Sequence, residues 1–377
     1  MRVLHVVAGL GQGGAEKQLV LLCSATSRPV EHEVVAVREE GVHARALRDL
    51  GIPVSCLGER ALYHPSVLAG LARRMRRFRP DVVHCWLPSM NVMGGLAAVL
   101  SGLDRPAVIA SVRNVDDWKS PLRIAADRLA GRLWDRVLCN SRAGMDCARR
   151  QGIPARKLHW VPNGVVERPI PDERERERTR ARYGVPPGGI LLISACRLVP
   201  QKQVGLLLPI LHGLRSRFPG VRLLVCGDGP LAPSLKEQAA TLGLSTEVTF
   251  IGAVDDPWPL LCASDALVMT SQREGTSNTL LEAMQAGCAV FATEAGDNAV
   301  LVGGAAGWTG AAPALASALA DALAQPAILA GYRAMARERA REFTVEKMAA
   351  STLGHYADLL RRQPEWRHGA PVLGKGE

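Results

Sequence analysis

The sequence has 377 residues, of which 47% are hydrophobic, so it is long enough for two ordinary domains that each bury a core. Its net charge is +10, but only 4% of the residues are aromatic and no nucleic-acid motif is present, which argues against a nucleic-acid-binding protein. No apolar run approaches the roughly 20 residues that a membrane-spanning helix needs, and the chain opens as a strand without a signal-peptide pattern.

The nine cysteines are scattered and include no C-x-x-C pair. Most lie in or beside apolar runs, as Cys85, Cys139, Cys226 and Cys262 do. This pattern is typical of reduced core thiols in a cytoplasmic protein, and it argues against disulfides and against cysteine metal ligands.

The positive charge is uneven along the chain. Residues 1–170 hold 25 Lys and Arg against 15 Asp and Glu, whereas the remainder holds 21 of each. The excess is densest between Arg73 and Arg79, where two interpretations stay open. The run is either a solvated helix face or a surface that attracts an anionic membrane or a lipid phosphate.

Strand and helix patterns alternate through the first half, which predicts a parallel sheet with helices on both faces. The predicted strands are residues 3–7, 32–37, 52–56, 81–84, 107–111 and 136–139, and the predicted helices are residues 65–78 and 91–101.

A glycine-rich turn follows the first strand, and Gly9, Gly11 and Gly14 satisfy G-x-G-x-x-G. That spacing is the dinucleotide fingerprint, so one alternative is a nicotinamide-dependent oxidoreductase. The nearest acids after the next strand, Glu39 and Glu40, come late for the carboxylate that would bind the ribose. Another alternative is a tight turn whose glycines need positive φ.

The second half begins with a charged segment, residues 169–182, and a buried strand, residues 190–195. Arg197 and Lys202 follow that strand. Two cations five positions apart across a strand-to-helix turn suit a diphosphate, although isolated charges of this kind are more often surface residues.

The stretch from Arg273 to Met284 follows the apolar run 266–269 and predicts a strand, a capped turn and a helix. The N–H groups of the first helical turn favour an anion. Glu274 and Glu282 accept hydrogen bonds only, so they suit hydroxyl groups. A sugar nucleotide would satisfy both features, and the alternative is an ordinary capped core helix.

Glu274-x7-Glu282, inside an E-G-x-x-N-x-x-L-E-A-M frame, resembles the signature of the retaining glycosyltransferases of family 4. The other motifs of that family occur in order along nearly the whole chain: Gly13-Gly14-Ala15-Glu16, Val161-Pro162-Asn163-Gly164-Val165, Arg197 with Lys202, Gly227-Asp228-Gly229-Pro230, and Phe250-Ile251-Gly252. The resemblance implies an α/β protein of the GT-B fold, with two Rossmann-like domains whose parallel sheets face each other across a cleft.

The same resemblance implies roles for individual residues. Glu274, Arg197 and Lys202 are the expected catalytic residues, with the two cations clamping the donor diphosphate without a metal. Glu274 would hold the donor sugar and Glu282 the ribose. The remaining expected donor-binding residues are Gly14, Gly252, Val254, Gly275, Thr276, Ser277, Asn278 and Thr279.

Three positions depart from the family pattern. Arg113 stands where many relatives have a histidine at the end of a strand, and arginine cannot serve as a neutral base. Cys196 and Gln203 replace two glycines, which puts the local backbone in doubt. The expected residues of the acceptor cleft are Gly13, Trp86, Asn91 and Arg113, although a tryptophan at a strand end also suits core packing.

The expected domains are an acceptor-binding domain (1–165), a linker with a first helix (166–188), a nucleotide-sugar-binding domain (189–342), a helix returning to the first domain (343–363) and a tail (364–377). The expected activity is metal-independent, retaining transfer from a UDP-sugar to a glycan or lipid-linked glycan in cell-envelope polysaccharide biosynthesis, with no cofactor. The expected location is the cytoplasm, including the inner face of its membrane. The alternatives are an NAD-dependent oxidoreductase, a sugar-nucleotide epimerase and a non-catalytic membrane scaffold.

Overall fold

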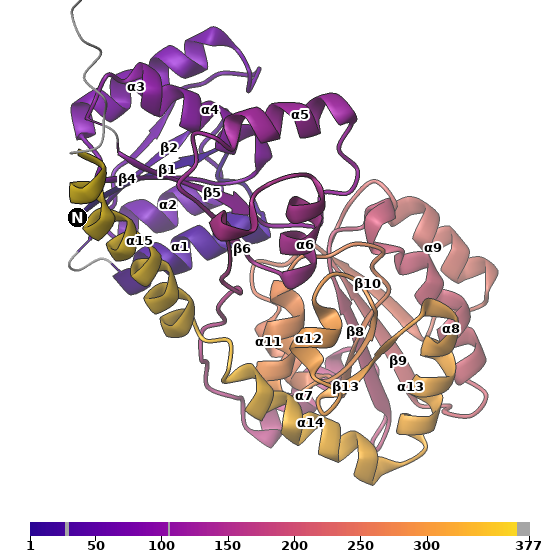
Figure 1. Cartoon of the computed structure of the whole chain (residues 1–377). Coiled ribbons are helices and arrows are strands. Elements are labelled where there is room, and N and C mark those ends of the chain that lie inside the picture. The colour runs from indigo at the N-terminus through magenta and orange to yellow at the C-terminus, as the bar shows by residue number, and fades with distance from the viewer. Residues whose placement is uncertain (27–29, 105, 368–377) are drawn as a thin grey trace, which may run out of the picture. The chain divides into compact units, whose positions relative to one another are not determined.

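The computed structural model describes residues 1–26, 30–104 and 106–367. The chain forms two compact units (Figure 1). Unit 1 consists of Met1–Pro162 and Val345–Glu377, and unit 2 consists of Asn163–Thr344. The predicted boundary fell after residue 165, with a linker over 166–188. We describe each unit by itself.

Unit 1 contains a seven-stranded, fully parallel sheet with the order β3-β2-β1-β4-β5-β6-β7. Most residues of these strands are buried, as expected for a parallel sheet covered on both sides. Their bounds are β1 Arg2–Val7, β2 Glu31–Ala36, β3 Val54–Cys56, β4 Val82–Cys85, β5 Ala107–Val112, β6 Arg136–Cys139 and β7 Leu158–Trp160.

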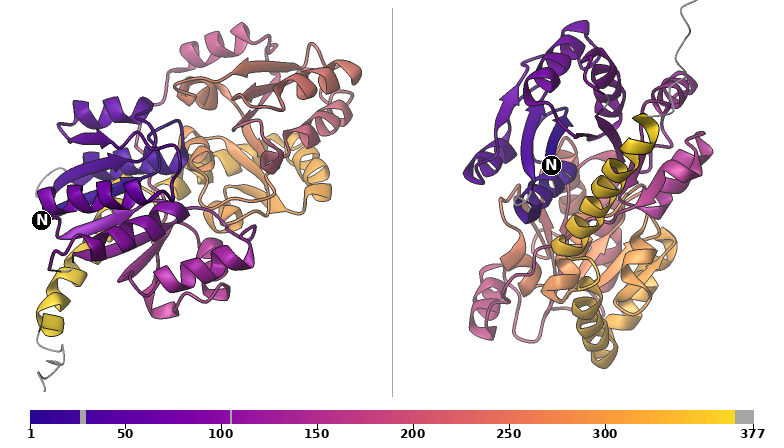
Figure 2. Two further views of the ribbon diagram at one scale, coloured as in Figure 1. Left: turned by 90° about the horizontal axis from the view of Figure 1, so that it is seen from above. Right: turned by 60° about the vertical axis from the view of Figure 1, so that its left-hand side comes forward.

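The helices of unit 1 cover both faces of this sheet (Figure 2). Alternate residues of β1 belong to different cores. Val3 and Val7 pack with α1, α2 and α15, whereas Leu4 and Val6 pack with α3 and α4. The helix bounds are α1 Gly14–Thr26, α2 Val42–Asp49, α3 Pro65–Phe78, α4 Pro88–Leu100, α5 Pro121–Ala130, α6 Arg142–Arg150 and α15 Val345–Arg367.

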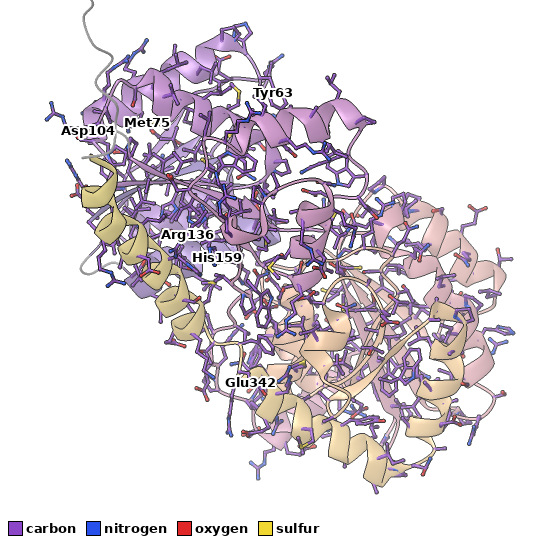
Figure 3. All side chains as sticks on the ribbon, in the orientation of Figure 1. Tyr63, Met75, Asp104, Arg136, His159 and Glu342 are labelled. Carbon is purple, nitrogen blue, oxygen red and sulfur yellow. The ribbon has the colours of Figure 1, made fainter. Side chains whose placement is uncertain are left out.

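Helix α15 lies beside α1, although the two are at opposite ends of the chain (Figure 1). Polar contacts fix it to the sheet: Arg136 donates to His355 Nδ1 at 2.5 Å and to Asp358 Oδ2 at 3.1 Å. Figure 3 shows Arg136 and His159 next to this helix. The predicted helix ended at residue 363, whereas α15 continues to Arg367. Residues 368–377 of the predicted tail lie outside the described residues.

Unit 2 contains a six-stranded parallel sheet with the order β10-β9-β8-β11-β12-β13. Its strands are β8 Ile190–Ala195, β9 Val221–Cys226, β10 Val248–Gly252, β11 Ala266–Met269, β12 Ala289–Thr293 and β13 Gly307–Gly310. Its helices are α7 Glu173–Arg182, α8 Leu207–Leu214, α9 Ala232–Thr241, α10 Trp258–Ala263, α11 Asn278–Ala286, α12 Asn298–Val302, α13 Leu315–Leu323 and α14 Pro326–Ala340.

The charged helix α7 is attached to this sheet through Asp265, just before β11. Asp265 Oδ2 accepts from Arg180 at 3.0 Å and from the N–H of Leu191 at 2.8 Å, and its Oδ1 accepts from Arg176 at 2.8 Å. Arg180 is only 5% exposed, so this part of the predicted linker and first helix belongs to the body of unit 2.

Two further expectations concern the chain as a whole. All nine cysteines are free and seven are buried, which confirms the predicted core thiols. Among the described residues, no single helix has the length and apolar character to cross a membrane; one pair of segments bent by 107°, Ala312–Leu323 and Pro326–Ala340, meets the length and composition test together.

Each sheet has one point at which the strand order reverses. In unit 1 it lies between β1 and β4, and in unit 2 between β8 and β11. Ligands of open parallel sheets bind beyond the carboxyl ends of the strands at such reversals. The loops that follow these four strands are therefore the first places to look for a site.

Candidate functional site

The loops after β8 and β11 are joined directly at the reversal point of unit 2. Gln201 donates its side-chain amide to the carbonyl of Arg273 at 2.7 Å, and its own carbonyl accepts from the N–H of Gln272 at 2.8 Å. The hydroxyl of Thr270 lies within hydrogen-bond distance of the carbonyls of Lys202 and Gln203, at 3.1 and 2.9 Å. Hydrogen bonds thus join the two predicted ligand-binding loops into one surface.

That surface presents an ion pair between the Lys202 ammonium and Oε1 of Glu274. The lysine side chain is 14% exposed and the glutamate side chain 9% exposed, so water screens the pair weakly. The structure therefore brings together two of the three residues predicted to be catalytic. The third, Arg197, is exposed at the start of the same loop.

Helix α11 begins next to this pair. Ser277 caps the helix by accepting a hydrogen bond from the N–H of Leu280 at 3.3 Å. Predicted residues Gly275, Thr276 and Ser277 are buried, and Asn278 and Thr279 are partly buried. The start of a helix carries partial positive charge, which suits an anionic ligand.

Asn163 is a site residue that the sequence analysis missed. Its amide donates to the carbonyl of Thr276 at 3.0 Å and to Oδ1 of Asn278 at 2.7 Å, so it holds the chain just before α11. Asn163 is buried. The signal was present, because this asparagine lies between Pro162 and Gly164 in a motif that the sequence analysis named without assigning its residues to the site.

Glycines let two further loops, after β9 and after β12, approach the same surface. A Cβ atom on Gly296 (φ 56°) would lie 2.0 Å from the carbonyl oxygen of Glu274. Cβ atoms on Gly227 and Gly229 would lie 1.9 and 2.5 Å from the carbonyl oxygens of Cys196 and Leu198. These positions need glycine because the backbones meet there.

The two glycine replacements behave differently. Gln203 keeps the left-handed backbone of a glycine, with φ 47° and ψ 36°, even though its side chain disfavours that region. Cys196 is not among the described residues with positive φ. The doubt about the local backbone therefore applies to Gln203 alone.

The other donor-binding residues predicted in unit 2 lie within α11 and at the end of β10. Glu282 is the fifth residue of α11 and is partly buried. The pKa of Arg168 is raised mainly by its hydrogen bonds to Asp256, and Glu282 adds a smaller effect. Gly252 ends β10 and accepts from the N–H of Gly227 at 2.7 Å, and Val254 follows it.

In unit 1 the glycine-rich loop follows β1, and Gly14 is the first residue of α1. None of its glycines has positive φ, so the tight-turn interpretation is wrong on that point. The loop contains a backbone turn, and the Glu16 side chain lies over it. The N–H of Gly13 donates to the carbonyl of Gly11 at 2.8 Å, and a Cβ on Gly13 would lie 1.9 Å from a carboxylate oxygen of Glu16.

The predicted acceptor residues Trp86 and Arg113 are in contact at the ends of β4 and β5. The guanidinium carbon of Arg113 lies 4.2 Å from the centroid of the Trp86 ring. Asn91 does not reach outward: its amide donates to the carbonyl of Ser111 at 2.9 Å and accepts from the N–H of Ser111 at 3.0 Å. Asn91 therefore braces the strand that carries Arg113.

The backbone is strained directly after Trp86. Leu87 has φ 74° and ψ 158°, a region that residues other than glycine occupy at a cost of about 1–3 kcal/mol. Strain of this size persists where the surrounding structure enforces it, and it is concentrated at functional sites.

A buried cluster in unit 1 consists of His5, Cys23 and His32. Their potential metal-ligating atoms lie within 4.8 Å of one another. Hydrogen bonds use the ring nitrogens. Thr26 donates to the carbonyl of Leu22, so it accepts from His32 Nε2 at 2.9 Å. His32 Nδ1 then accepts from His5 Nε2 at 3.0 Å. This hydrogen-bond pattern is that of neutral histidines in a protein core rather than of metal ligands.

Family models match both halves of the chain. The model "Glycosyltransferase Family 4" matches residues 12–167, and the model "Glycosyl transferases group 1" matches residues 175–343. Together they cover both loop surfaces described above.

Two curated relatives and one solved structure show the same likeness. The lipopolysaccharide core biosynthesis glycosyltransferase LpsE of Rhizobium meliloti is 27% identical over 78% of this chain and 79% of its own. A GDP-mannose-dependent phosphatidylinositol monomannoside mannosyltransferase of Mycobacterium tuberculosis is 31% identical over 63% of this chain and 66% of its own. Anabaena HepE, solved with UDP and glucose, has a TM-score of 0.84 at 21% identity, over 95% of this chain and 100% of its own.

These comparisons do not favour the oxidoreductase or the epimerase interpretation, and the two parallel sheets match the GT-B architecture. The chain belongs to the glycosyltransferases of the family 4 type, and it has the GT-B fold.

Proposed function

We propose that this glycosyltransferase moves a sugar from a nucleotide-sugar donor to a glycan or lipid-linked glycan acceptor, with retention of the anomeric configuration. The observation that carries this proposal is the Lys202–Glu274 ion pair at the strand-order reversal of unit 2, beside the start of α11. A cation, a carboxylate and a helix N-terminus in one place suit a diphosphate joined to a polyol.

When the donor binds, Lys202 and Glu274 separate and each contacts a different part of the ligand. Lys202, Arg197 and the N–H groups around Thr276–Asn278 stabilise the leaving diphosphate. Glu274 then accepts hydrogen bonds from the hydroxyls of the donor sugar, and Glu282 accepts from the ribose. The acceptor hydroxyl attacks the anomeric carbon on the face from which the phosphate leaves, and the leaving phosphate oxygen takes its proton.

This mechanism uses no protein nucleophile, no metal and no cofactor. The two cations provide the charge that a metal would otherwise provide at the diphosphate. Arg113, where many relatives have histidine, is consistent with it because the proton goes to the leaving phosphate.

The proposed donor is a UDP-sugar. HepE, which shares the fold, was solved with UDP, whereas the mycobacterial relative depends on GDP-mannose. The name of LpsE supports an acceptor from cell-envelope polysaccharide or lipopolysaccharide synthesis.

We further propose that unit 1 contacts an anionic membrane surface from the cytoplasmic side. Arg73, Arg76 and Arg77 are exposed on α3. Leu122 and Leu129 on α5 are 80% and 65% exposed. Basic and apolar side chains on one unit suit anionic lipid headgroups and the acyl boundary below them.

A thermal-shift screen of UDP, GDP, ADP and NAD(H) tests the donor site. A ligand at 100 times its Kd adds about 2.7 kcal/mol of stability. We expect a shift with UDP that Lys202→Ala abolishes. A shift with GDP alone would mean that the donor carries guanine rather than uracil. A shift with NAD(H) alone would overturn the proposed activity. NMR of the transfer product, with the donor anomer as reference, then tests retention.

Sedimentation with vesicles tests the membrane proposal separately. We expect wild-type protein to pellet with phosphatidylglycerol vesicles but not with phosphatidylcholine vesicles. The triple variant Arg73→Ser, Arg76→Ser, Arg77→Ser should stay in the supernatant with both. Equal pelleting of wild type and variant would contradict a role for α3.

A further inference from the structure

We propose that Arg113 and Trp86 form a subsite in unit 1 that binds an anionic group, phosphate or carboxylate, of the acceptor. The proposal rests on the function proposed above in one respect, namely that the bound anion belongs to an acceptor of glycosyl transfer. It goes further by assigning the chemical class of that acceptor.

The location of the pair is the first reason. Trp86 directly follows β4, and Arg113 directly follows β5, the strand that pairs with β4. Strand β4 also forms one side of the strand-order reversal in unit 1, and the other side, β1, leads into the glycine-rich loop. Ligands of open parallel sheets bind beyond the carboxyl ends of the strands. A cation at that edge is therefore positioned to contact an anionic ligand.

The geometry of the pair is the second reason. With its carbon 4.2 Å from the ring centroid, the Arg113 guanidinium lies over the Trp86 face. A guanidinium held on an aromatic ring loses little entropy when it binds an oxyanion, and its planar fork matches two oxygens of phosphate or carboxylate.

The support beneath Trp86 is built from neutral polar groups. The indole N–H donates to His5 Nδ1 at 3.2 Å, and the His84 ring stacks on Trp86 with centroids 4.7 Å apart. His84 Nδ1 is 2.6 Å from the hydroxyl of Tyr356, and its Nε2 is 2.7 Å from the hydroxyl of Ser111. Helix α15 therefore contacts, through Tyr356, the polar groups that pack against Trp86.

The charge balance supports an anion at this place. Burial keeps the pKa of both His5 and His84 well below the usual value, and it raises the pKa of Tyr356 well above. These groups are neutral at pH 7. Burial also lowers the pKa of Arg113, to about 10, so Arg113 remains a cation.

Tyr356 and Cys139 raise the pKa of Arg113 against the effect of burial, and Glu16, the one carboxylate among these groups, raises it by a smaller amount. Glu16 lies on the first turn of α1 and folds back against Gly13. An anionic acceptor group therefore competes with Glu16 for Arg113. The competition predicts that removal of the Glu16 charge strengthens anion binding, whereas removal of the Arg113 charge weakens it.

The strained residue Leu87 is the independent observation. Its left-handed backbone follows Trp86 directly, and hydrogen bonds hold both sides of it, from the N–H of Trp86 to Val6 and from the N–H of Asn91 to Leu87. The chain thus tolerates strain to keep Trp86 in place under Arg113, which indicates a functional role for this position.

The test uses isothermal titration with three probes: methyl α-glucuronide (carboxylate), glucose 6-phosphate (phosphate) and methyl α-glucoside (neutral). We expect at least one anionic probe to bind about tenfold more tightly than the neutral probe, on the scale of a charge-assisted hydrogen bond. Arg113→Met should remove that difference, Arg113→Lys should restore part of it, and Glu16→Gln should enlarge it. The tighter of the two anionic probes identifies the group.

Two controls keep the outcome decisive. Lys202→Ala, which disables the donor site of unit 2, should leave anion binding unchanged, so failure of the donor proposal and failure of this one are distinguishable. Tyr356→Phe tests a positioning residue: it should reduce the preference for the anionic probe without weakening binding of the neutral probe. Anionic binding that is unchanged in Arg113→Met, lost in Lys202→Ala, or no tighter than neutral binding in wild type would overturn the proposal.

Discussion

The ammonium of Lys202 is paired with the carboxylate of Glu274, although the two residues are 72 positions apart in the sequence. They follow β8 and β11, the neighbouring strands at which the order of the sheet reverses. The pair holds the two side chains together at this reversal, and we expect donor binding to give each group a new partner.

Loss of the Lys202 charge should therefore damage catalysis more than folding. We expect Lys202→Ala to lower kcat/KM by about 10²–10³, the scale of one lost electrostatic donor in a transition state. Glu274→Gln should lower it as well, and the double variant should lose less than the sum of the two losses because the residues act as a unit. Steady-state kinetics measure all three. Lys236→Ala, an exposed lysine on α9, is the matched control, and an unchanged rate in Lys202→Ala would refute the assignment.

The strain at Gln203 predicts a stabilising substitution. Gln203→Gly removes a left-handed backbone penalty of about 1–2 kcal/mol. Part of that gain, about 0.4–1 kcal/mol, is offset by the larger entropy of glycine in the unfolded chain. We expect a net gain on the order of 0.5–1 kcal/mol in the free energy of unfolding.

Cys196→Gly is the matched control for that substitution, because Cys196 fills the other family glycine without positive φ. It should lose stability, since glycine there raises the entropy of the unfolded chain and relieves no strain. Chemical denaturation of both variants decides. Equal effects would show that the φ of Gln203 is not the source of the difference.

The fold could be predicted from the sequence because its signals are local. Apolar runs such as residues 190–195 and 266–269 coincide with β8 and β11, and α3 begins and ends at the predicted residues. Strands β7 and β13 were not predicted: β7 has only three residues, one of them a histidine, and β13 begins and ends with glycine. Such short segments gain strand structure from their neighbours rather than from their own pattern.

The site could be predicted only in part, for a different reason. Motif spacing indicated Lys202 and Glu274, and the structure pairs them. Spacing could not indicate that Asn163 holds the start of α11, or that Tyr356 hydrogen-bonds His84 across 272 positions, because those contacts are made by tertiary structure. The role of Arg113 stays a prediction.

Two glycines offer a test of the close backbone approach beside Glu274. Gly296 and Gly304 both have positive φ, at 56° and 74°. A Cβ on Gly296 would collide with the carbonyl of Glu274, whereas a Cβ on Gly304 would meet no atom within 4 Å. Gly304→Ala should therefore cost about 1–2 kcal/mol for its backbone alone.

Gly296→Ala should cost more than that, because the loop must also move away from Glu274. We expect Gly296→Ala to lower the affinity for the nucleoside diphosphate that stabilises wild type. Gly304→Ala should leave that affinity unchanged. Thermal unfolding with and without ligand measures both effects. Equal losses of stability and of affinity in the two variants would contradict the close approach.

The buried histidines of unit 1 predict a loss of stability in mild acid. Burial lowers the pKa of His32 to about 4 and holds the pKa of His5 and His84 well below 6.5. As the pH falls below 6.5, these histidines bind protons in the unfolded chain but remain neutral in the folded chain. The free energy of unfolding therefore decreases. Above 6.5 both states are neutral and these groups add no slope. For His32 alone the loss by pH 4 is about 3 kcal/mol, from a difference of about 2.5 units.

Denaturation of wild type at intervals between pH 7.5 and 4.5 measures this slope. His32→Gln removes one of the titrating groups, so its stability should fall less steeply between pH 6.5 and 4.5, whatever its stability at pH 7.5. If His32→Gln kept the wild-type slope, burial of His32 would not be the source of it, and the assignment of neutral groups below Trp86 would have to be revised.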